Sequence, residues 1–302
     1  MQNEICGVVI VDKHEGVTSH DIVFKIRKLF GTKKVGHTGT LDPMATGVLP
    51  VLIGRSAKAS EYLLAEDKAY EATIQLGITT DTEDTSGTVL TRYDALPTKE
   101  QFFEACTHFV GDIMQIPPMY SALKVNGQKL VDLARKGIEI ERQARQIHIS
   151  SIVPSVVDEE KGVYKLSVEC SKGTYIRTLC ADIGAYLGCG ASMSALRRTK
   201  SGNFTINYAH TIEEIDKMSY EQRMALLMPT ESLFEELDSV TLSDFYARLC
   251  RSGCEIYQRK IGASFEVGTK VRMCDKNGFF ALGEVREYPD GLAIKALKLF
   301  VL

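Results

Sequence analysis

One stretch of this sequence, GHTGTLDPMATGVLP at residues 36–50, combines residue types suited to a catalytic loop. Pro43 disfavours helical backbone at the residue before it, so the Asp42 carboxylate is expected on an extended segment or a turn. Glycines at positions 36, 39 and 47 allow the main chain to bend tightly and to approach another molecule closely. The loop therefore suits a carboxylate catalyst facing a phosphate-bearing substrate, and a plain Asp-Pro turn is the alternative.

The positive charge of the chain is clustered, although its net charge is −3. No acidic residue lies between Ile22 and Leu41, and a second basic group follows Leu196. Local patches of this kind favour nucleic-acid binding whatever the total charge, and solvated helix faces are the alternative interpretation. The cationic residues are Lys25, Arg27, Lys28, Lys33, Lys34, Arg197, Arg198 and Lys200.

Several common motifs are absent from the sequence. The segment GTKKVGH lacks the Lys-Ser/Thr of a phosphate-binding P-loop, and no GxGxxG, GxSxG or HExxH motif occurs. The six histidines are scattered and the eight cysteines form no CxxC pair. We therefore expect no nucleotide cofactor, no metal site and reduced cysteines.

The elements that must position the loop alternate irregularly between strands and helices. The run GVVIVDK (7–13) predicts a buried strand, and TSHDIVFKIRKLF (18–30) predicts a helix capped by Thr18 or Ser19. We expect alternating strands at 70–77 and 163–170, and a helix that begins within 172–188. The fold class is therefore α+β, built on a mixed sheet.

The later part of the chain has shorter predicted elements and more turns. Asn126-Gly127 predicts a hairpin turn, followed by a short helix closed by Gly137. From about residue 236, short strands alternate with the turns KNG and PDG. We expect two domains, at residues 1–235 and 236–302. Neither a membrane span nor a signal peptide is apparent, which predicts a cytoplasmic protein.

Five collinear motifs resemble the TruB family of tRNA pseudouridine synthases: GHTGTLDPMATGVLP, DKAYEATIQLGITTDTEDTSG, IPPMYSALKVNGQKLVDLARKG, GTYIRTLCADIG and LRRTKSGNF. The resemblance implies an enzyme that isomerises one uridine of the tRNA T-loop, position 55, to pseudouridine without a cofactor. It also implies that residues 236–302 form a PUA-like RNA-binding domain. The implied partner is the T-arm of tRNA, with no membrane or protein partner, and we expect a monomer.

The same resemblance assigns roles to individual residues. Asp42 matches the catalytic aspartate, Arg177 the arginine that pairs with it, and Tyr70 the tyrosine that stacks on the flipped base and acts in proton removal. Without the family, the pattern favours Tyr70 as a core residue and Arg177 as a surface residue at a helix start. The expected substrate-binding residues are His37, Tyr175, Asp84 and Lys13, and the expected RNA-backbone contacts are Lys33, Lys34, Arg197 and Arg198.

Two positions depart from the family pattern: His14 replaces a proline, which affects the local turn, and Val131 replaces a tyrosine. The chemical route stays open among a covalent adduct at C1′, addition at C6 and a glycal route, since each needs one carboxylate and one nearby base. The alternatives to a synthase are a non-catalytic tRNA-binding or tRNA-folding protein and a glycoside hydrolase that uses Asp42 and Asp84.

Overall fold

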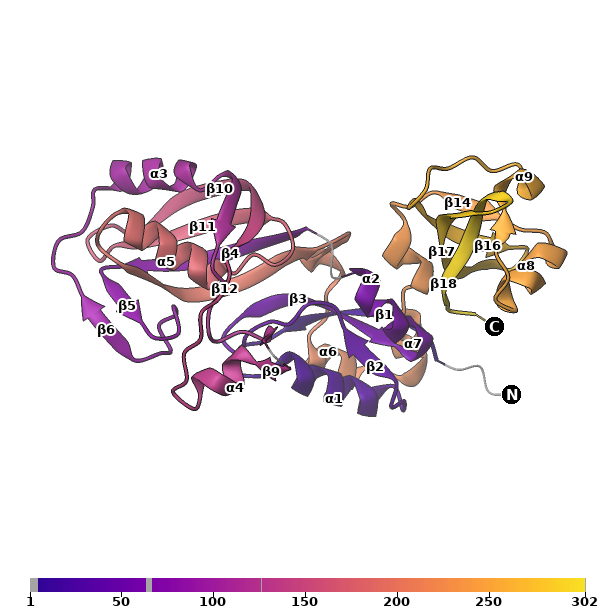
Figure 1. Cartoon of the computed structure of the whole chain (residues 1–302). Helices are drawn as coiled ribbons and strands as arrows, with labels where there is room; N and C mark the ends of the chain where they lie inside the picture. The colour runs from indigo at the N-terminus through magenta and orange to yellow at the C-terminus, as the bar shows by residue number, and fades with distance from the viewer. Residues whose placement is uncertain (1–4, 64–66, 126, 302) are drawn as a thin grey trace.

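A nine-stranded mixed sheet dominates the computed structural model, which describes residues 5–63, 67–125 and 127–301. The order along the sheet is β1-β3-β12-β4-β11-β10-β7, with β2 paired to β3 and β13 paired to β12 (Figure 1). The pairs are antiparallel except for β3 and β12, so the predicted mixed sheet and α+β class are confirmed. The strands are β1 Gly7–Lys13, β2 Val35–His37, β3 Thr46–Ile53, β4 Lys68–Leu76, β7 Gly111–Gln115, β10 Arg145–Asp158, β11 Val163–Cys170, β12 Ala191–Ser201 and β13 Phe204–Thr205.

Three helices pack on this sheet and enclose the main core: α1 Ser19–Leu29, α3 Lys99–His108 and α5 Ile176–Tyr186. Helix α1 begins where predicted, because the Thr18 side chain accepts the Asp21 amide and Asp21 accepts the Thr18 amide in return. Ile22, Val23 and Ile26 of this helix lie in the core. The helix thus presents one face to the sheet and holds the loop that follows it.

Shorter elements connect the main ones. Strands β8 (Lys124–Val125) and β9 (Gln128–Lys129) pair antiparallel around Gly127, whose φ is 81°; the other residue of the predicted turn, Asn126, lies outside the described residues. The remaining elements are η1 Gly54–Ala59, α2 Ser60–Leu63, β5 Ile78–Thr80, β6 Val89–Arg92, α4 Leu130–Ala134, η2 Ile206–Tyr208, α6 Ile212–Lys217, α7 Tyr220–Ala225 and η3 Thr230–Phe234.

A five-stranded sheet in the order β14-β16-β17-β18-β15 forms the C-terminal lobe. Its predicted β-rich character is confirmed, since the KNG and PDG turns join β16 to β17 and β17 to β18. The lobe contains β14 Ser239–Thr241, α8 Asp244–Arg251, β15 Ile256–Tyr257, α9 Gln258–Ile261, β16 Lys270–Asp275, β17 Gly278–Tyr288 and β18 Gly291–Leu299.

Strands β1 and β3 are buried on both faces, which explains their uninterrupted apolar sequences. Val9 and Val11 face the main core, whereas Val8 and Ile10 join a second core with residues of the C-terminal lobe, including Leu282 and Phe300. The lobe therefore packs against the face of β1 and β3 that is opposite the main core.

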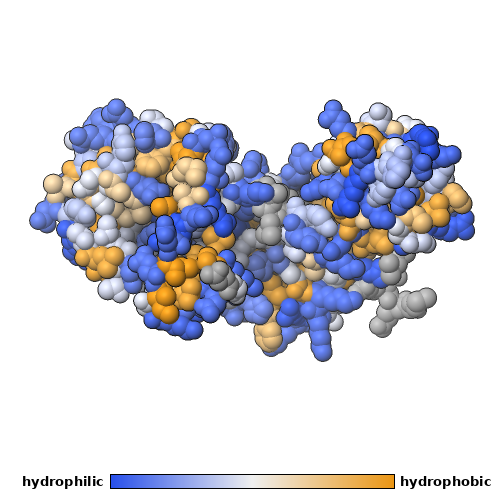
Figure 2. Space-filling model, viewed as in Figure 1, coloured by the Kyte–Doolittle hydropathy of each residue, from blue (hydrophilic) through white to orange (hydrophobic). Residues whose placement is uncertain are grey.

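The surface is mostly hydrophilic in the view of Figure 2, with apolar residues in separate patches. Exposed large apolar side chains such as Leu90, Met114 and Val153 lie on different strands. No helix in the described part of the chain is long and apolar enough to span a membrane.

Candidate active site

Asp42 lies on the loop between β2 and β3, and hydrogen bonds from several elements fix this loop. Ser19, at the start of α1, donates through Oγ to the Leu41 carbonyl (3.2 Å) and accepts the Leu41 amide (2.9 Å). The Pro43 carbonyl accepts the Gly16 amide (2.9 Å). The Asp42 side chain remains 38% exposed, so a rigid loop presents its carboxylate to solvent.

Arg177, the second residue of α5, holds the Asp42 carboxylate. Its Nε lies 3.0 Å from Asp42 Oδ2, and the guanidinium is only 6% exposed. Nη1 donates to the Thr82 carbonyl (3.0 Å) and Nη2 to the Tyr120 carbonyl (2.8 Å). Because the guanidinium is anchored in three directions, Arg177 is a buried clamp on the carboxylate, and the surface-residue alternative is wrong.

Asp84 forms the other acidic contact of this clamp, with Oδ2 3.6 Å from Arg177 Nη1. Its Oδ1 accepts hydrogen bonds from Thr82 Oγ1 (2.8 Å), the Ser86 amide (3.0 Å) and Ser86 Oγ (2.5 Å). The residue is 5% exposed. The expected contact between Asp84 and the substrate base does not fit this burial; Asp84 closes a turn and supports Arg177.

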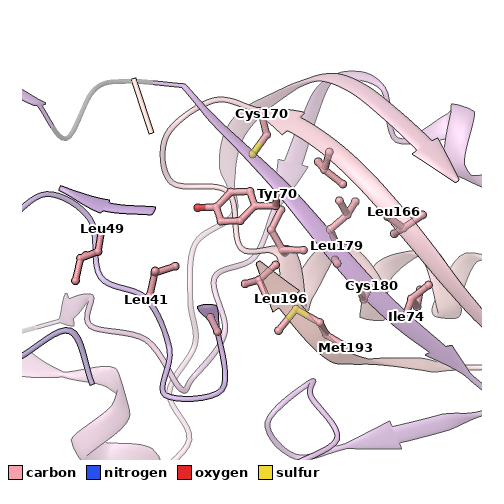
Figure 3. Close-up of a cluster of buried hydrophobic side chains, with 14 of the residues drawn as sticks. Leu41, Leu49, Tyr70, Ile74, Leu166, Cys170, Leu179, Cys180, Met193 and Leu196 are labelled. Carbon is pink, nitrogen blue, oxygen red and sulfur yellow. The ribbon is translucent and has the colours of Figure 1, made fainter. Parts of the chain in front are cut away.

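Tyr70 extends from β4 into the core, and its hydroxyl points toward the segment that carries Leu41 and Leu49 (Figure 3). It is 8% exposed, and burial raises the pKa of its hydroxyl. The positive charge of Arg198, opposite Tyr70 on β12, acts against the rise. The tyrosine thus has the environment of a core residue and a hydroxyl that reaches the loop of Asp42.

The position of Arg198 contradicts its expected contact with the RNA backbone. It is 1% exposed, and its Nε and Nη2 donate to the carbonyls of Val48 (2.7 Å) and Gly39 (3.1 Å). A guanidinium buried in this way cannot touch an RNA phosphate. The basic cluster after Leu196 therefore divides, because alternate residues of β12 point to opposite faces of the sheet.

The expected contact of Lys13 with substrate does not fit its position either. Its side chain is fully buried, and Nζ donates to the carbonyls of His14 (3.0 Å), Val17 (2.8 Å) and Pro43 (3.2 Å). Burial lowers the pKa of Lys13 to about 8, against the opposing effect of Asp42. Lys13 therefore ties the turn after β1 to the catalytic loop, and His14 is accommodated in that turn through its carbonyl.

His37 ends β2 and is half-buried beside the loop. Burial is the main cause that lowers its pKa, and the nearby Arg198 charge adds to this effect, so the ring is neutral at pH 7. Within the described residues its buried Nδ1 has no hydrogen-bond partner. A neutral imidazole with an unsatisfied nitrogen at the start of the loop that carries Asp42 is suited to a polar contact with a base or a ribose.

Tyr175 precedes α5 and is positioned through its backbone. Its amide donates to Gln115 Oε1 (2.8 Å), and its carbonyl accepts from Gln115 Nε2 (3.1 Å). Gln115 is 2% exposed at the end of β7, and the sequence analysis missed it. Its only sequence signal is its place directly before the IPPMYSALK motif.

The remaining cations lie toward the surface. Lys33 and Lys34 are exposed just before β2 and His37. Arg197 is half-exposed and binds the Asp12 carboxylate through Nη1 (3.2 Å) and Nη2 (2.7 Å), so its charge is already paired. Among the described residues, no group of three His, Cys, Asp or Glu side chains could hold a metal ion.

The sequence matches two family models. The TruB family pseudouridylate synthase N-terminal domain matches residues 27–176, and the tRNA pseudouridylate synthase B C-terminal domain matches residues 177–248. The chain is 41% identical over 279 residues to a tRNA pseudouridine synthase B of Clostridium tetani, covering 92% of this chain and 95% of that protein. It is 42% identical over 292 residues to one of Stutzerimonas stutzeri, covering 95% and 94%.

Solved structures of the same fold extend the comparison. A Cbf5-Nop10-Gar1 complex contains a chain with 27% identity and a TM-score of 0.75, covering 98% of this chain and 85% of that one. An H/ACA RNP bound to a substrate RNA containing 2'-deoxyuridine contains a chain with 26% identity and a TM-score of 0.73, with the same coverage. The similarity thus includes both lobes.

Proposed function

Because this chain belongs to the TruB family of pseudouridylate synthases, we propose that it isomerises uridine 55 in the T-loop of tRNA to pseudouridine. The observation that carries the proposal is the Arg177 clamp on Asp42: a partly exposed carboxylate held by a buried guanidinium beside a tyrosine. The relatives named tRNA pseudouridine synthase B, at about 40% identity over most of their length, support the substrate class.

The reaction breaks the bond between C1′ and N1, turns the uracil and forms a bond between C1′ and C5. The C5 hydrogen leaves as a proton and N1 gains one, so atoms and electrons balance without a cofactor. The target base must first leave its stack, at a cost of about a few kcal/mol. In our proposal His37 takes part in this extrusion, Asp42 attacks, and Tyr70 stacks on the flipped base and accepts the C5 proton.

Contacts with the rest of the tRNA come from surfaces around this site. We assign the approach of the T-arm to the exposed Lys33 and Lys34, and we assign RNA binding to residues 236–302 as a PUA-like domain. The half-exposed Arg197 can reach a phosphate only if it shares its charge with Asp12. A cytoplasmic monomer that binds one tRNA completes the proposal.

A glycoside hydrolase is disfavoured by the same geometry. Such an enzyme needs a second carboxyl group that reaches the scissile bond. Asp84 is buried, and its oxygens are occupied by Thr82, Ser86 and Arg177. A non-catalytic tRNA-binding protein, in turn, has no need of a solvent-facing carboxylate clamped beside a tyrosine.

The test uses unmodified tRNA transcripts labelled with tritium at uridine C5. We expect the protein to release one equivalent of tritium per tRNA in excess of the release from a transcript in which uridine 55 is replaced by cytidine. Equal release from both transcripts would contradict the position, and release from neither would contradict the activity.

A further inference from the structure

Arg198 and Tyr70 are direct cross-strand partners in the middle of the nine-stranded sheet. Their Cα positions pair in the antiparallel register of β12 and β4, and both side chains point to the same face as Leu196. The Arg198 guanidinium lies within reach of the Tyr70 hydroxyl and acts on it through its charge. Tyr70 therefore faces this arginine on the neighbouring strand, and its hydroxyl points toward the loop segment that carries Leu41 (Figure 3).

The guanidinium also holds the loop itself. Its Nε and Nη2 donate to the carbonyls of Val48 and Gly39, which lie on either side of Asp42 in the sequence. The chain comes so close that a Cβ on Gly47 would stand 2.2 Å from the Arg198 carbonyl oxygen, and one on Gly39 would stand 3.3 Å from Nη1. One side chain thus connects both ends of the catalytic loop to Tyr70.

The charge of Arg198 is not balanced by an acid. In the described part of the chain no carboxylate forms an ion pair with it, and its hydrogen bonds go to the carbonyls of Val48 and Gly39. Burial of a guanidinium with only neutral partners is costly, and an apolar side chain of similar volume would pack here at lower cost. The position therefore points to a role for the charge beyond packing.

The charge of Arg198 acts on the Tyr70 hydroxyl. Besides Arg198, the groups that act on this hydroxyl are Cys170 on β11 and Asp42 on the loop. Burial, Cys170 and Asp42 all raise the pKa of Tyr70, whereas the positive charge of Arg198 lowers it. Arg198 is thus the cation that favours a tyrosinate in this site.

We infer that Arg198 is a positioning residue that aims the Tyr70 hydroxyl at the loop of Asp42 and stabilises Tyr70 in its deprotonated form. The inference rests on the proposed function. In the last step the C5–H bond breaks, its electron pair restores the C5–C6 double bond, and the proton goes to the Tyr70 oxygen. The tyrosinate becomes a neutral phenol, which then loses this proton to water.

The test places a fluorinated tyrosine of low intrinsic pKa at position 70 and follows its fluorine resonance during a pH titration. We expect the midpoint to lie at least about one pH unit higher in Arg198→Met than in the parent protein, since a nearby cation favours the charged phenolate. Arg198→Lys, which keeps the charge and loses the planar fork, should titrate between the two.

Arg223→Met is the matched control, because Arg223, like Arg198, donates to backbone carbonyls, in its case those of Ile215 (3.0 Å), Leu29 (3.1 Å) and Asp216 (2.8 Å). It should lower thermal stability and leave the resonance at position 70 unmoved. In single-turnover tritium release with native tyrosine, we expect Arg198→Met to lower the rate about 10²-fold at unchanged tRNA affinity.

An unchanged midpoint in any folded Arg198 variant would overturn the inference, even if that variant were less stable. Should Arg198→Met fail to fold, the comparison of Arg198→Lys with the parent decides in the same way. The titration does not require catalysis. If the parent protein released no tritium but its midpoint still lay below that of Arg198→Met, the proposed function would be contradicted and the Arg198–Tyr70 coupling would stand.

Discussion

The Nε atom of Arg177 lies 3.0 Å from the Asp42 carboxylate, although the two residues come from a helix and a loop that are distant in sequence. The same guanidinium lies 3.6 Å from Asp84, which is almost completely buried. Arg177 therefore pairs with two carboxylates: that of Asp42, which is exposed enough to contact substrate, and that of Asp84, which is buried.

Removal of this arginine should leave the Asp84 charge uncompensated. We expect Arg177→Met to lower the free energy of unfolding by about 3–5 kcal/mol, because a buried partner loses its counter-charge. The double variant Arg177→Met/Asp84→Asn should recover part of that loss, as measured by urea denaturation at pH 7. Equal stabilities of the single and double variants would show that Asp84 does not depend on Arg177.

The close approach of β12 to the catalytic loop should make Gly47 intolerant of any side chain. Gly47 has φ 102° and would place a Cβ against the Arg198 backbone, whereas Gly31 has φ 63° and open space around it. We expect Gly31→Ala to cost about 1 kcal/mol from its backbone conformation alone, and Gly47→Ala at least about 3 kcal/mol. Thermal or urea unfolding of the pair measures this difference, and similar costs would contradict the contact.

Lys13 should make stability depend on pH in the alkaline range. Its pKa is lowered from 10.5 to about 8 in the folded state, so between these values the unfolded chain binds more protons and stability rises with pH. We expect the free energy of unfolding of the wild type, minus that of Lys13→Met, to rise by about 1.4 kcal/mol per pH unit above pH 8. A difference that stays constant from pH 7 to 10 would mean that buried Lys13 keeps its proton.

Charge reversal at Lys33 and Lys34 should weaken tRNA binding. Each lost phosphate contact lowers the slope of log affinity against log salt by about one unit. Lys161→Glu serves as the control, since Lys161 lies on the turn after β10, is 77% exposed and pairs with Asp158, the last residue of that strand. If the wild type, the charge-reversal variant and Lys161→Glu had the same slope of log affinity against log salt, Lys33 and Lys34 would be ordinary solvated side chains that do not contact phosphate.

Much of the fold follows from local patterns in the sequence. Unbroken apolar runs predict β1, alternation predicts β4 and β11, and the Asp-Pro pair places Asp42 on a loop. The surroundings of Arg177 could not be predicted in this way, because two of its acceptors are the backbone carbonyls of Thr82 and Tyr120, which have no residue signature.

Arg198 shows the opposite failure, since a signal was present in the sequence. Grouping Arg197 and Arg198 by charge predicts one exposed patch. Leu196 and Arg198 are two residues apart on a strand and share the buried face, while Arg197 points away toward Asp12. Strand alternation, applied to charged residues as well as apolar ones, would have separated the two arginines.

The central claim is that Asp42, held by Arg177, performs the isomerisation. The most direct test compares single-turnover tritium release by the wild type and by Asp42→Ala on the same tRNA transcript, with tRNA affinity measured in parallel. We expect one equivalent from the wild type, none above background from Asp42→Ala, and similar affinities, because phosphate contacts supply most of the binding. A rate in Asp42→Ala above about a tenth of the wild-type rate would contradict this claim.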